Sequence, residues 1–439
     1  MPSKTKVLAG VVLAVTLSGS VHAQLSEVPK AFEALDRGDG EAAQGTFSRA
    51  AVEALLALAE SQRGDAQKST LARAAELVPA DAEGLRQRVQ GMQLLAEGKN
   101  AEAAALYGAL ATREPRDKRV QYFLGVARQR ADDLPGAIVA LREATNLDRA
   151  FGVALVALGD ALRQAGDFGG AYNAYNHATT PDGRPVSALL GRAASRMLIG
   201  DMEGAASDLE LAIKISAPGM DRYRSLMGMF FLRAYERKVA DGTSRVEQAV
   251  AMWQELGRTD MAVAACNAAG RIFLETGDPD GGESWYQAGW NLVLDSKTAA
   301  EERTLWQVRM LHGTARAAAA RRDFNRADSL VAQAKGLMDQ DSRNAEHYAW
   351  IYPYLKAYVE LSRRDPDAAI ANLQAVPAKE MDRPYLQFLM AEAYSRKRDR
   401  DAARLWYEKA LASATGLDPE TVIVRPLAVA WLAKNPAKN

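Results

Sequence analysis

The chain has 439 residues, with 55 basic and 55 acidic side chains that give a formal net charge of zero. Proteins that bind nucleic acid specifically usually present a concentrated basic face. Neither this balance nor any long run of like charge predicts such a face, and we expect no nucleic-acid partner. The one cysteine, Cys266, excludes an intramolecular disulfide framework. It stands in an apolar run, residues 261–269, where we expect a small buried hydrophobe rather than a reactive thiol.

The first residues have the layout of a secretory signal peptide. Lys4 and Lys6 precede an apolar run at residues 7–17, and small residues follow as far as Ala23. We therefore predict a signal peptide over residues 1–23, cleaved after Ala23, and a periplasmic or secreted protein. The apolar run is too short to span a bilayer. No other stretch is apolar enough, so we expect no transmembrane segment in the mature chain.

Beyond residue 80, small residues recur at a fixed step of 34 positions. One series is Gly91, Gly125, Gly159 and Ala193. A second series is Ala103, Ala137, Ala171 and Ala205. A period in this range is typical of a solenoid, in which each repeat is one supersecondary unit that packs against its neighbours.

One unit of this period shows the expected local structure clearly. Its first helix carries apolar residues at steps of three and four, namely Leu155, Leu158 and Leu162. Gly166 then ends that helix, because glycine takes the left-handed conformation easily, and Asp167 can cap the next one. The second helix carries the inner stripe Ala171, Tyr175 and Ala178. The unit is therefore a helical hairpin, which has to stack on other hairpins to bury its apolar face.

These spacings of large apolar, small, Ala and aromatic residues resemble the tetratricopeptide repeat family. The resemblance implies an all-α, right-handed α-solenoid of about eleven helical hairpins over residues 26–417. The inter-helix turn recurs, in glycine-free form, at Arg322-Asp323, Arg364-Asp365 and Arg398-Asp399. Turn spacing stretches to between 42 and 45 residues from Asp278 to Asp365, which predicts longer helices or loops in that part of the chain.

We expect four segments along the chain. The signal peptide (1–23) precedes an N-terminal array at 24–219 and a C-terminal array with longer repeats at 220–418. A capping helix with a frayed tail follows at 419–439. The residues Ala217, Pro218 and Gly219 mark either a linker between two arrays or a local turn in one continuous superhelix.

Several motifs that suggest chemistry have a structural explanation. The tripeptide Arg-Gly-Asp occurs at 37–39 and at 63–65, where the repeat requires its turn. Asp36, Asp39 and Glu41 lack the ligand pattern of a calcium loop, and the histidines have no partner at metal-ligand spacing. No phosphate-binding glycine loop, dinucleotide motif or serine nucleophile motif is present. We therefore predict no catalytic residues, no metal and no cofactor, and expect the protein not to be an enzyme.

In tetratricopeptide arrays the first helix of each hairpin lines the concave surface. Transferring the outward face of the helix with Val156 and Asp160 to the later repeats predicts a groove with a basic centre and aromatic flanks. Its residues are Tyr235, Asn267, Arg271, Arg309, His312, Arg316, Tyr354, Tyr358, Tyr385 and Phe388. The alternative is that these large side chains fill wider gaps in the core of longer repeats; all seven tryptophans fall between Trp253 and Trp431.

The resemblance implies a non-catalytic scaffold or adaptor that binds a protein or peptide partner on its concave face in the cell envelope. Arginine grips carboxylates and tyrosine stacks on apolar groups, which suits an extended peptide. A glycan remains possible as ligand, so the alternatives are a cell-wall or polysaccharide-binding module and an accessory subunit of an envelope enzyme. Some relatives bind a C-terminal carboxylate with Lys and Asn. Tyr122 and Val126 stand at such places here and argue against that mode in the N-terminal repeats.

Overall fold

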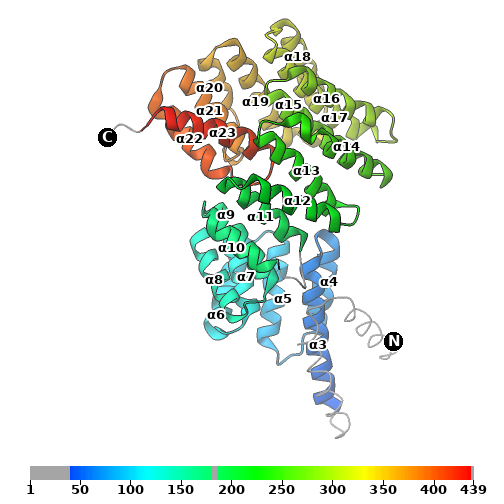
Figure 1. Ribbon diagram of the computed structural model, residues 1–439. Coiled ribbons are helices and arrows are strands. Elements are labelled where there is room, and N and C mark those ends of the chain that lie inside the picture. The colour runs from blue at the N-terminus through cyan, green and yellow to red at the C-terminus, as the bar shows by residue number, and fades with distance from the viewer. Residues whose placement is uncertain (1–39, 180–184, 437–439) are drawn as a thin grey trace. The chain divides into compact units, whose positions relative to one another are not determined.

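The computed structural model describes residues 40–179 and 185–436, which form 21 α-helices, α3 to α23, and no strand (Figure 1). The all-α solenoid expected from the sequence is confirmed, and the helix count is close to that of eleven hairpins. The chain divides into two compact units, Met1–Ala161 (unit 1) and Leu162–Asn439 (unit 2). The predicted signal peptide, the Arg-Gly-Asp at 37–39 and the acidic cluster around Asp39 lie outside the described residues.

In unit 1 the first helix is long and the helices that follow it are shorter and similar in length. They are α3 (Gly40–Ser61), α4 (Gly64–Leu77), α5 (Glu83–Ala96), α6 (Asn100–Arg113), α7 (Lys118–Arg130) and α8 (Leu134–Leu147). The 34-residue glycine period has a steric cause. A Cβ atom at Gly91 would lie 2.6 Å from the ring of Tyr107, and one at Gly125 would lie 2.5 Å from the side chain of Leu141. Both helix pairs therefore pack at a distance that only glycine permits.

Unit 2 begins within α9 (Gly152–Gln164) and holds the longest helices of the later repeats. Its helices are α10 (Phe168–Ala178), α11 (Val186–Ile199), α12 (Met202–Ile215), α13 (Met220–Tyr235), α14 (Val239–Glu255), α15 (Thr259–Glu275), α16 (Pro279–Leu294), α17 (Ala300–Ala320), α18 (Phe324–Gln340), α19 (Ala345–Arg363), α20 (Pro366–Gln374), α21 (Pro384–Arg396), α22 (Arg400–Ser413) and α23 (Pro419–Lys434). The stretched turn spacing arises from longer helices, since α17 has 21 residues and α19 has 19.

The expected boundary at 219/220 differs from the division at 161/162. Gly219 lies in the turn between α12 and α13, and these two helices contact each other. Helix α11 also contacts α13. Residues 217–219 therefore form a local turn inside unit 2 rather than a linker between arrays.

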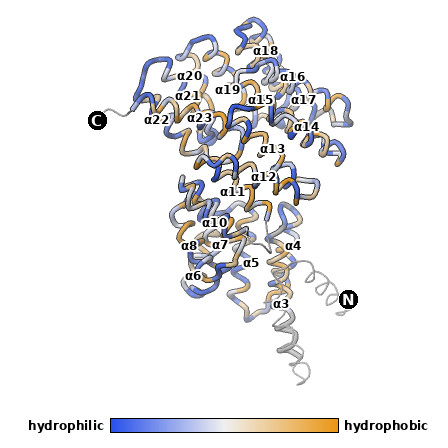
Figure 2. Tube along the Cα trace, viewed as in Figure 1, coloured by the Kyte–Doolittle hydropathy of each residue, from blue (hydrophilic) through white to orange (hydrophobic). Residues whose placement is uncertain are grey.

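The inter-helix turns have the structure expected from the sequence. Gly166 has a left-handed φ of 81°, and the Asp167 carboxylate accepts a hydrogen bond of 2.8 Å from the backbone N–H of Gly170. Such a contact satisfies one of the free N–H groups at a helix N-terminus. In the glycine-free turns the same left-handed position is occupied by arginine, with φ of 65° at Arg322 and 70° at Arg364. Figure 2 shows hydrophilic stretches at many of the connections between helices.

First helices line the inner side of each unit. In the described chain, the first helices of successive hairpins contact each other more extensively than the second helices do. The pairs are α3 with α5, α11 with α13, α15 with α17, α17 with α19, and α19 with α21. Helix α23 makes further contacts of its own. Curvature brings first helices together and spreads second helices apart. The described helices include none long and apolar enough to cross a membrane.

The expected capping helix is present as α23, and it does more than cover the last hairpin. It contacts α22 and α21, and also α13 and α15, more than 140 residues away in sequence (Figure 1). Val422, Ile423 and Val424 are buried in the same core cluster as residues of α13 and α21. Helix α23 therefore joins the two ends of the curved inner face of unit 2.

Candidate functional site

The inner side of unit 2 contains a hollow of about 260 Å³ between α15, α17 and α19, with the first residue of α23 at its edge. We call it the unit 2 hollow. It is lined by Asn267, Ala268, Arg271, Tyr286, Leu305, Val308, Arg309, His312, Arg316, His347, Tyr348, Trp350, Ile351, Tyr354 and Pro419. Six of the ten residues predicted for the groove are among them: Asn267, Arg271, Arg309, His312, Arg316 and Tyr354.

The other four predicted residues do not line the hollow. Tyr358 and Tyr385 lie behind it, with the Arg316 guanidinium 4.5 Å and 5.7 Å from their ring centres. Phe388 is a core residue, 6% exposed, packed against the rings of Tyr385 and Tyr407. Tyr235 is half-buried on α13 and packs against the core cluster. The outward face of the earlier first helices thus continues into the core in α21. There the Tyr385 side chain contacts Arg271 and Glu275 of α15, and Phe388 packs against Tyr385 and Tyr407.

The predicted basic centre is largely neutralised by carboxylates from other helices. Arg316 is 1% exposed and forms an ion pair with Glu275 at the end of α15. The Tyr385 hydroxyl donates a hydrogen bond of 2.5 Å to the same Glu275 carboxylate and accepts one of 3.3 Å from Arg316. A buried charge needs this kind of pairing to offset its lost hydration. Arg316 therefore holds three helices together.

Arg271 is paired by the C-terminal helix. Its guanidinium lies 3.2 Å from the Glu420 carboxylate in the first turn of α23 and 4.6 Å from the centre of the Tyr385 ring. Glu420 also accepts a hydrogen bond of 3.3 Å from the backbone N–H of Tyr385. The Arg271–Glu420 pair thus fixes the start of α23 at the edge of the hollow.

Arg309 differs from the other two arginines. It is half-exposed on α17 and lies 4.9 Å from the centre of the Trp306 ring. Within residues 40–179 and 185–436, no carboxylate lies within ion-pair distance of it. Burial lowers the pKa of Arg309, and its cationic charge is not compensated by any described acidic side chain in contact with it.

Buried polar atoms without a hydrogen-bond partner gather around the unit 2 hollow. They are Asn267 Nδ2, Arg271 Nε, His312 Nε2, Arg316 Nε, His347 Nε2 and Tyr354 Oη. A buried polar group left unpaired costs about 1–3 kcal/mol, and most such groups in proteins are paired. Six of the eleven such atoms among the described residues belong to side chains that line this one hollow.

The two histidines of the hollow are held neutral by their surroundings. His312 is buried, and burial, followed by the positive charges of Arg316, Arg271 and Arg309, holds its pKa well below the usual value of 6.5. Its ring lies 4.9 Å from that of Tyr354. Burial and the charges of Arg309 and Arg383 lower the pKa of His347 as well. The hollow is therefore positive through arginine alone at neutral pH.

Two lining residues, His347 and Trp350, were not predicted from the sequence although a signal existed. His347, Trp350 and Tyr354 stand three and four residues apart, so they share one face of α19. Only Tyr354 was taken from that stripe. Pro419 had no local signal, because its place at the hollow depends on the path of α23.

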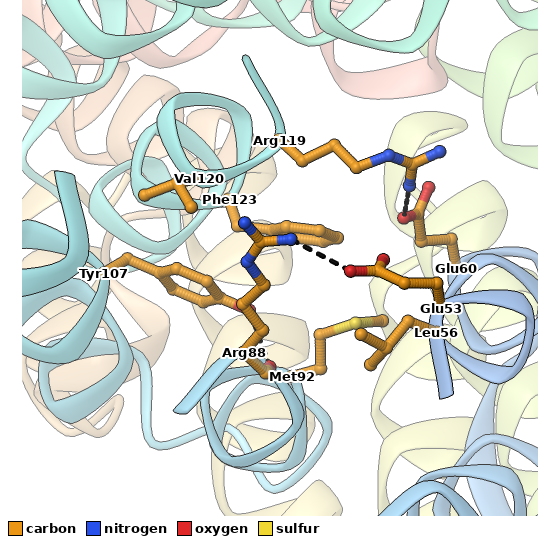
Figure 3. A pocket seen from close by; sticks show the side chains of 9 residues that line it. All are labelled: Glu53, Leu56, Glu60, Arg88, Met92, Tyr107, Arg119, Val120 and Phe123. Carbon is orange, nitrogen blue, oxygen red and sulfur yellow. Dashed lines mark hydrogen bonds and ion pairs between the residues drawn. The ribbon is translucent and has the colours of Figure 1, made fainter. Parts of the chain in front are cut away.

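Unit 1 contains a much smaller hollow, of about 10 Å³, between α3, α5 and α7 (Figure 3). Arg88 pairs with Glu53 at 3.1 Å and Arg119 pairs with Glu60 at 2.6 Å across it, as Figure 3 shows. The rings of Tyr107 and Phe123 close the remaining space. Tyr122 and Val126 line an adjoining hollow of about 60 Å³. The charges of Arg88 and Arg119 are thus matched by carboxylates of the same unit.

The described residues contain no group of three or more His, Cys, Asp or Glu side chains that could hold a metal ion. Cys266 is buried, and burial raises the pKa of its thiol to about 12. A low thiol pKa is what makes a cysteine reactive.

Solved structures of low identity resemble the chain. A tetratricopeptide repeat protein from Parabacteroides merdae is 15% identical, with a TM-score of 0.35 over 71% of this chain and 98% of its own. The human IFIT1 dimer with PPP-AAAA is 13% identical, with a TM-score of 0.42 over 90% of each chain. A Rap protein complexed with competence and sporulation factor is 12% identical, with a TM-score of 0.39 over 81% of this chain and 99% of its own. Likenesses this weak say nothing about a shared site.

Among curated proteins, no significant match was found. Family models are more informative, because they match defined segments of the sequence. One tetratricopeptide repeat model matches residues 88–150 and 156–221, and a second matches residues 384–415. The matched segments lie at both ends of the helical array, and together with the hairpins and capped turns described above they support the tetratricopeptide repeat family for this chain.

Proposed function

We propose that this protein is a non-catalytic scaffold that binds a protein or peptide partner through the inner face of unit 2. Tetratricopeptide repeats generally mediate protein–protein interaction. The observation that carries the proposal is the set of unpartnered buried polar atoms that converge on the unit 2 hollow. A bound partner would supply the missing hydrogen bonds, so binding would remove a cost that the free protein bears.

The size of the hollow favours an anchor residue of a larger partner. Pockets for drug-sized molecules usually measure about 300–1,000 Å³, whereas this one measures about 260 Å³. One side chain or chain end fits such a space, while the rest of a peptide would lie along the first helices. A few anchors of this kind supply most of the binding energy at protein interfaces, about 1–4 kcal/mol each.

The cell envelope is the proposed location. It is supported by the charged, apolar and small-residue layout of residues 1–23. Fractionation of the host and N-terminal sequencing of the recovered protein test this. A mature chain that begins at Gln24 in the periplasmic or secreted fraction would support the location. A cytoplasmic chain that keeps residues 1–23 would rule it out.

Site-specific cross-linking tests the binding proposal directly. A photo-reactive amino acid placed at Ile351, which lines the hollow, should give an adduct with one partner protein when the full chain is irradiated in its own host. Adding Arg309→Glu should abolish that adduct, since Arg309 is half-exposed and bears the uncompensated charge. Adding Arg326→Glu on α18 should leave it intact, because Arg326 pairs with Glu283 outside the hollow.

A second reactive position supplies the spatial control. Lys335 on α18 has a side chain that is 42% exposed, and it pairs with Asp339 away from the hollow. The reactive residue at this position should therefore give no adduct. The absence of any protein adduct from Ile351, with cell-wall material retained on the purified chain, would favour the polysaccharide-binding alternative. Adducts from Ile351 that persist with Arg309→Glu would contradict the role of Arg309 in holding the partner.

A further inference from the structure

The unit 2 hollow fits one chemical class of bound group. We propose that it binds a carboxylate carried on a short apolar or aromatic body. The inference deepens the proposed function by naming the group that the hollow recognises, and it rests on that function only for the question of what carries the carboxylate. The carrier is either a residue of the peptide partner or a free small acid.

Charge is the first argument. Three arginines line the hollow, and two of them are paired with carboxylates, Arg316 with Glu275 and Arg271 with Glu420. Arg309 has no such partner in the described chain. The site therefore carries one unmatched positive charge, which a monoanion neutralises. A phosphate monoester, with a charge of about −1.5 to −2 at neutral pH, would leave the hollow negative.

The unpartnered atoms supply the second argument. Asn267 Nδ2 and Arg271 Nε can only donate hydrogen bonds, and the Tyr354 hydroxyl can donate as well. Tyr354 is 5% exposed, so water does not satisfy it freely. An ionised carboxylate accepts through two oxygens with about four lone-pair positions and donates nothing. A carboxylate therefore matches these donors and the one excess positive charge. The unpartnered Nε2 atoms of His312 and His347 also donate to it in the tautomer of the neutral ring that carries the proton on Nε2.

The walls of the hollow supply the third argument. Leu305, Val308 and Ile351 form an apolar side, and the rings of Tyr286 and Trp350 lie nearby. An apolar cavity of about 150 Å³ is large enough for benzene, and this hollow measures about 260 Å³. One ring or branched aliphatic group with a two-carbon acid chain therefore fits, with its carboxylate toward Arg309 and the unpartnered donors.

Calorimetric titration of the full mature chain tests the inference with a matched pair of probes. The acid is 3-phenylpropionate and its neutral analogue is 3-phenylpropionamide, which has the same shape and no charge. We expect the acid to bind at least about tenfold more tightly than the amide. Arg309→Gln should weaken acid binding by about tenfold or more and leave the weak binding of the amide unchanged.

Two controls protect this result from a folding artefact. Arg326→Gln removes an arginine outside the hollow and should leave acid binding unchanged. Tyr354→Phe keeps the ring packing and removes only the unpartnered hydroxyl, so it should weaken the acid several-fold while circular dichroism stays unaltered. Equal binding of acid and amide, no binding of the acid at millimolar concentration, or indifference to Arg309→Gln would overturn the inference.

Peptide probes separate the two carriers and keep the failure of the inference distinct from that of the proposed function. One peptide, acetyl-Ala-Ala-Phe, has a free C-terminal carboxylate; the second is its C-terminal amide; the third, acetyl-Ala-Ala-Glu-Ala-amide, has only a side-chain carboxylate. Binding of the first or third peptide, lost with Arg309→Gln, supports a partner residue as carrier. Binding of 3-phenylpropionate alone supports the carboxylate site and contradicts its use as a peptide anchor. An Ile351 cross-link to a partner, combined with indifference to every carboxylate probe, would keep the scaffold and reject the carboxylate.

Discussion

The inner faces of units 1 and 2 are built from the same kind of helical hairpin, yet their arginine side chains are paired with carboxylates to different extents. In unit 1, Arg88 contacts the carboxylates of Glu53, Glu114 and Asp117. The hollow that Arg88 and Glu53 help to line measures about 10 Å³. In unit 2 the hollow measures about 260 Å³ and Arg309 has no described carboxylate in contact. The helices differ in length as well, with 14 residues in α5 and 21 in α17. Helix length alone does not set the size of the hollow, because α3, with 22 residues, borders the small hollow of unit 1. The difference lies in how the side chains of each inner face are paired and packed.

The comparison can be tested separately in each unit, because the tryptophans report on unit 2 alone. All seven lie between Trp253 and Trp431. Tryptophan fluorescence therefore follows the unfolding of unit 2, while far-ultraviolet circular dichroism follows all helices. A substitution confined to unit 1 should shift the unfolding curve measured by circular dichroism and leave the midpoint measured by tryptophan fluorescence unchanged.

Removal of α23 should have the largest effect. Ending the chain at Asp418 exposes the core positions that Val422, Ile423 and Val424 cover, each worth about 1.5–3 kcal/mol of burial, and frees Arg271 from Glu420. We expect unit 2 to lose about 5 kcal/mol or more of unfolding free energy in urea, measured by tryptophan fluorescence. An unchanged fluorescence midpoint would show that α23 is only a terminal cover.

Loss of one buried carboxylate should rank second. Glu275→Ala leaves the Arg316 guanidinium, which is 1% exposed, without its ion pair, and such unpaired buried charges cost about 3–5 kcal/mol. The matched change in unit 1 is Glu60→Ala, whose partner Arg119 retains 21% side-chain exposure, so we expect a loss nearer 1 kcal/mol. Equal losses in urea unfolding would contradict the view that only unit 2 depends on a buried charge.

Glycine packing should give smaller and more similar losses in the two units. A Cβ atom at Gly313 would lie 2.4 Å from the ring of Tyr286, and one at Gly125 would lie 2.5 Å from Leu141. Overpacking of this kind costs about 1–3 kcal/mol. Gly313→Ala should also weaken binding of 3-phenylpropionate, since Tyr286 lines the hollow, whereas Gly125→Ala should not. Titration of both variants with the same probe decides the point.

Mild acid should have the smallest effect. Burial and the charges of three arginines lower the pKa of His312 in the folded protein. Below about pH 6.5, His312 therefore binds a proton in the unfolded chain while it stays neutral in the folded chain. Stability is therefore fully present above pH 6.5 and is lost as the pH falls, by at most about 1.4 kcal/mol per pH unit for one histidine. His312→Gln should reduce this slope between pH 7 and pH 5.5, as measured by the urea midpoint of tryptophan fluorescence. A slope that is the same in both proteins would show that other groups cause it.

Much of the fold could be predicted because the signals are local. The close approach of Gly91 to Tyr107 and the cap of Asp167 on Gly170 involve residues within one hairpin. Six of the predicted groove residues line one hollow because a helix places residues at steps of three and four on one face, which a sequence shows directly. Their role in binding stays a prediction.

The rest could not be predicted because it depends on pairs far apart in the chain. Glu275 lies 110 residues from Tyr385, and Arg271 lies 149 residues from Glu420. No local pattern indicates which carboxylate reaches which arginine. The contacts of Tyr385 with Arg271 and Glu275 likewise bury it in the core and not on the predicted surface, and Phe388 is buried beside it against Tyr407.

The sequence by itself determined the repeat, the all-helical hairpins and the face of each first helix, since these follow from helix periodicity, turn conformation and capping within about 34 residues. Only the tertiary structure decided which of those faces remained open, which arginines were neutralised and where α23 packed. The curvature of the stack is the sum of small rotations from one hairpin to the next. The distances between α13, α15, α21 and α23 therefore depend on the whole stack and not on any single repeat.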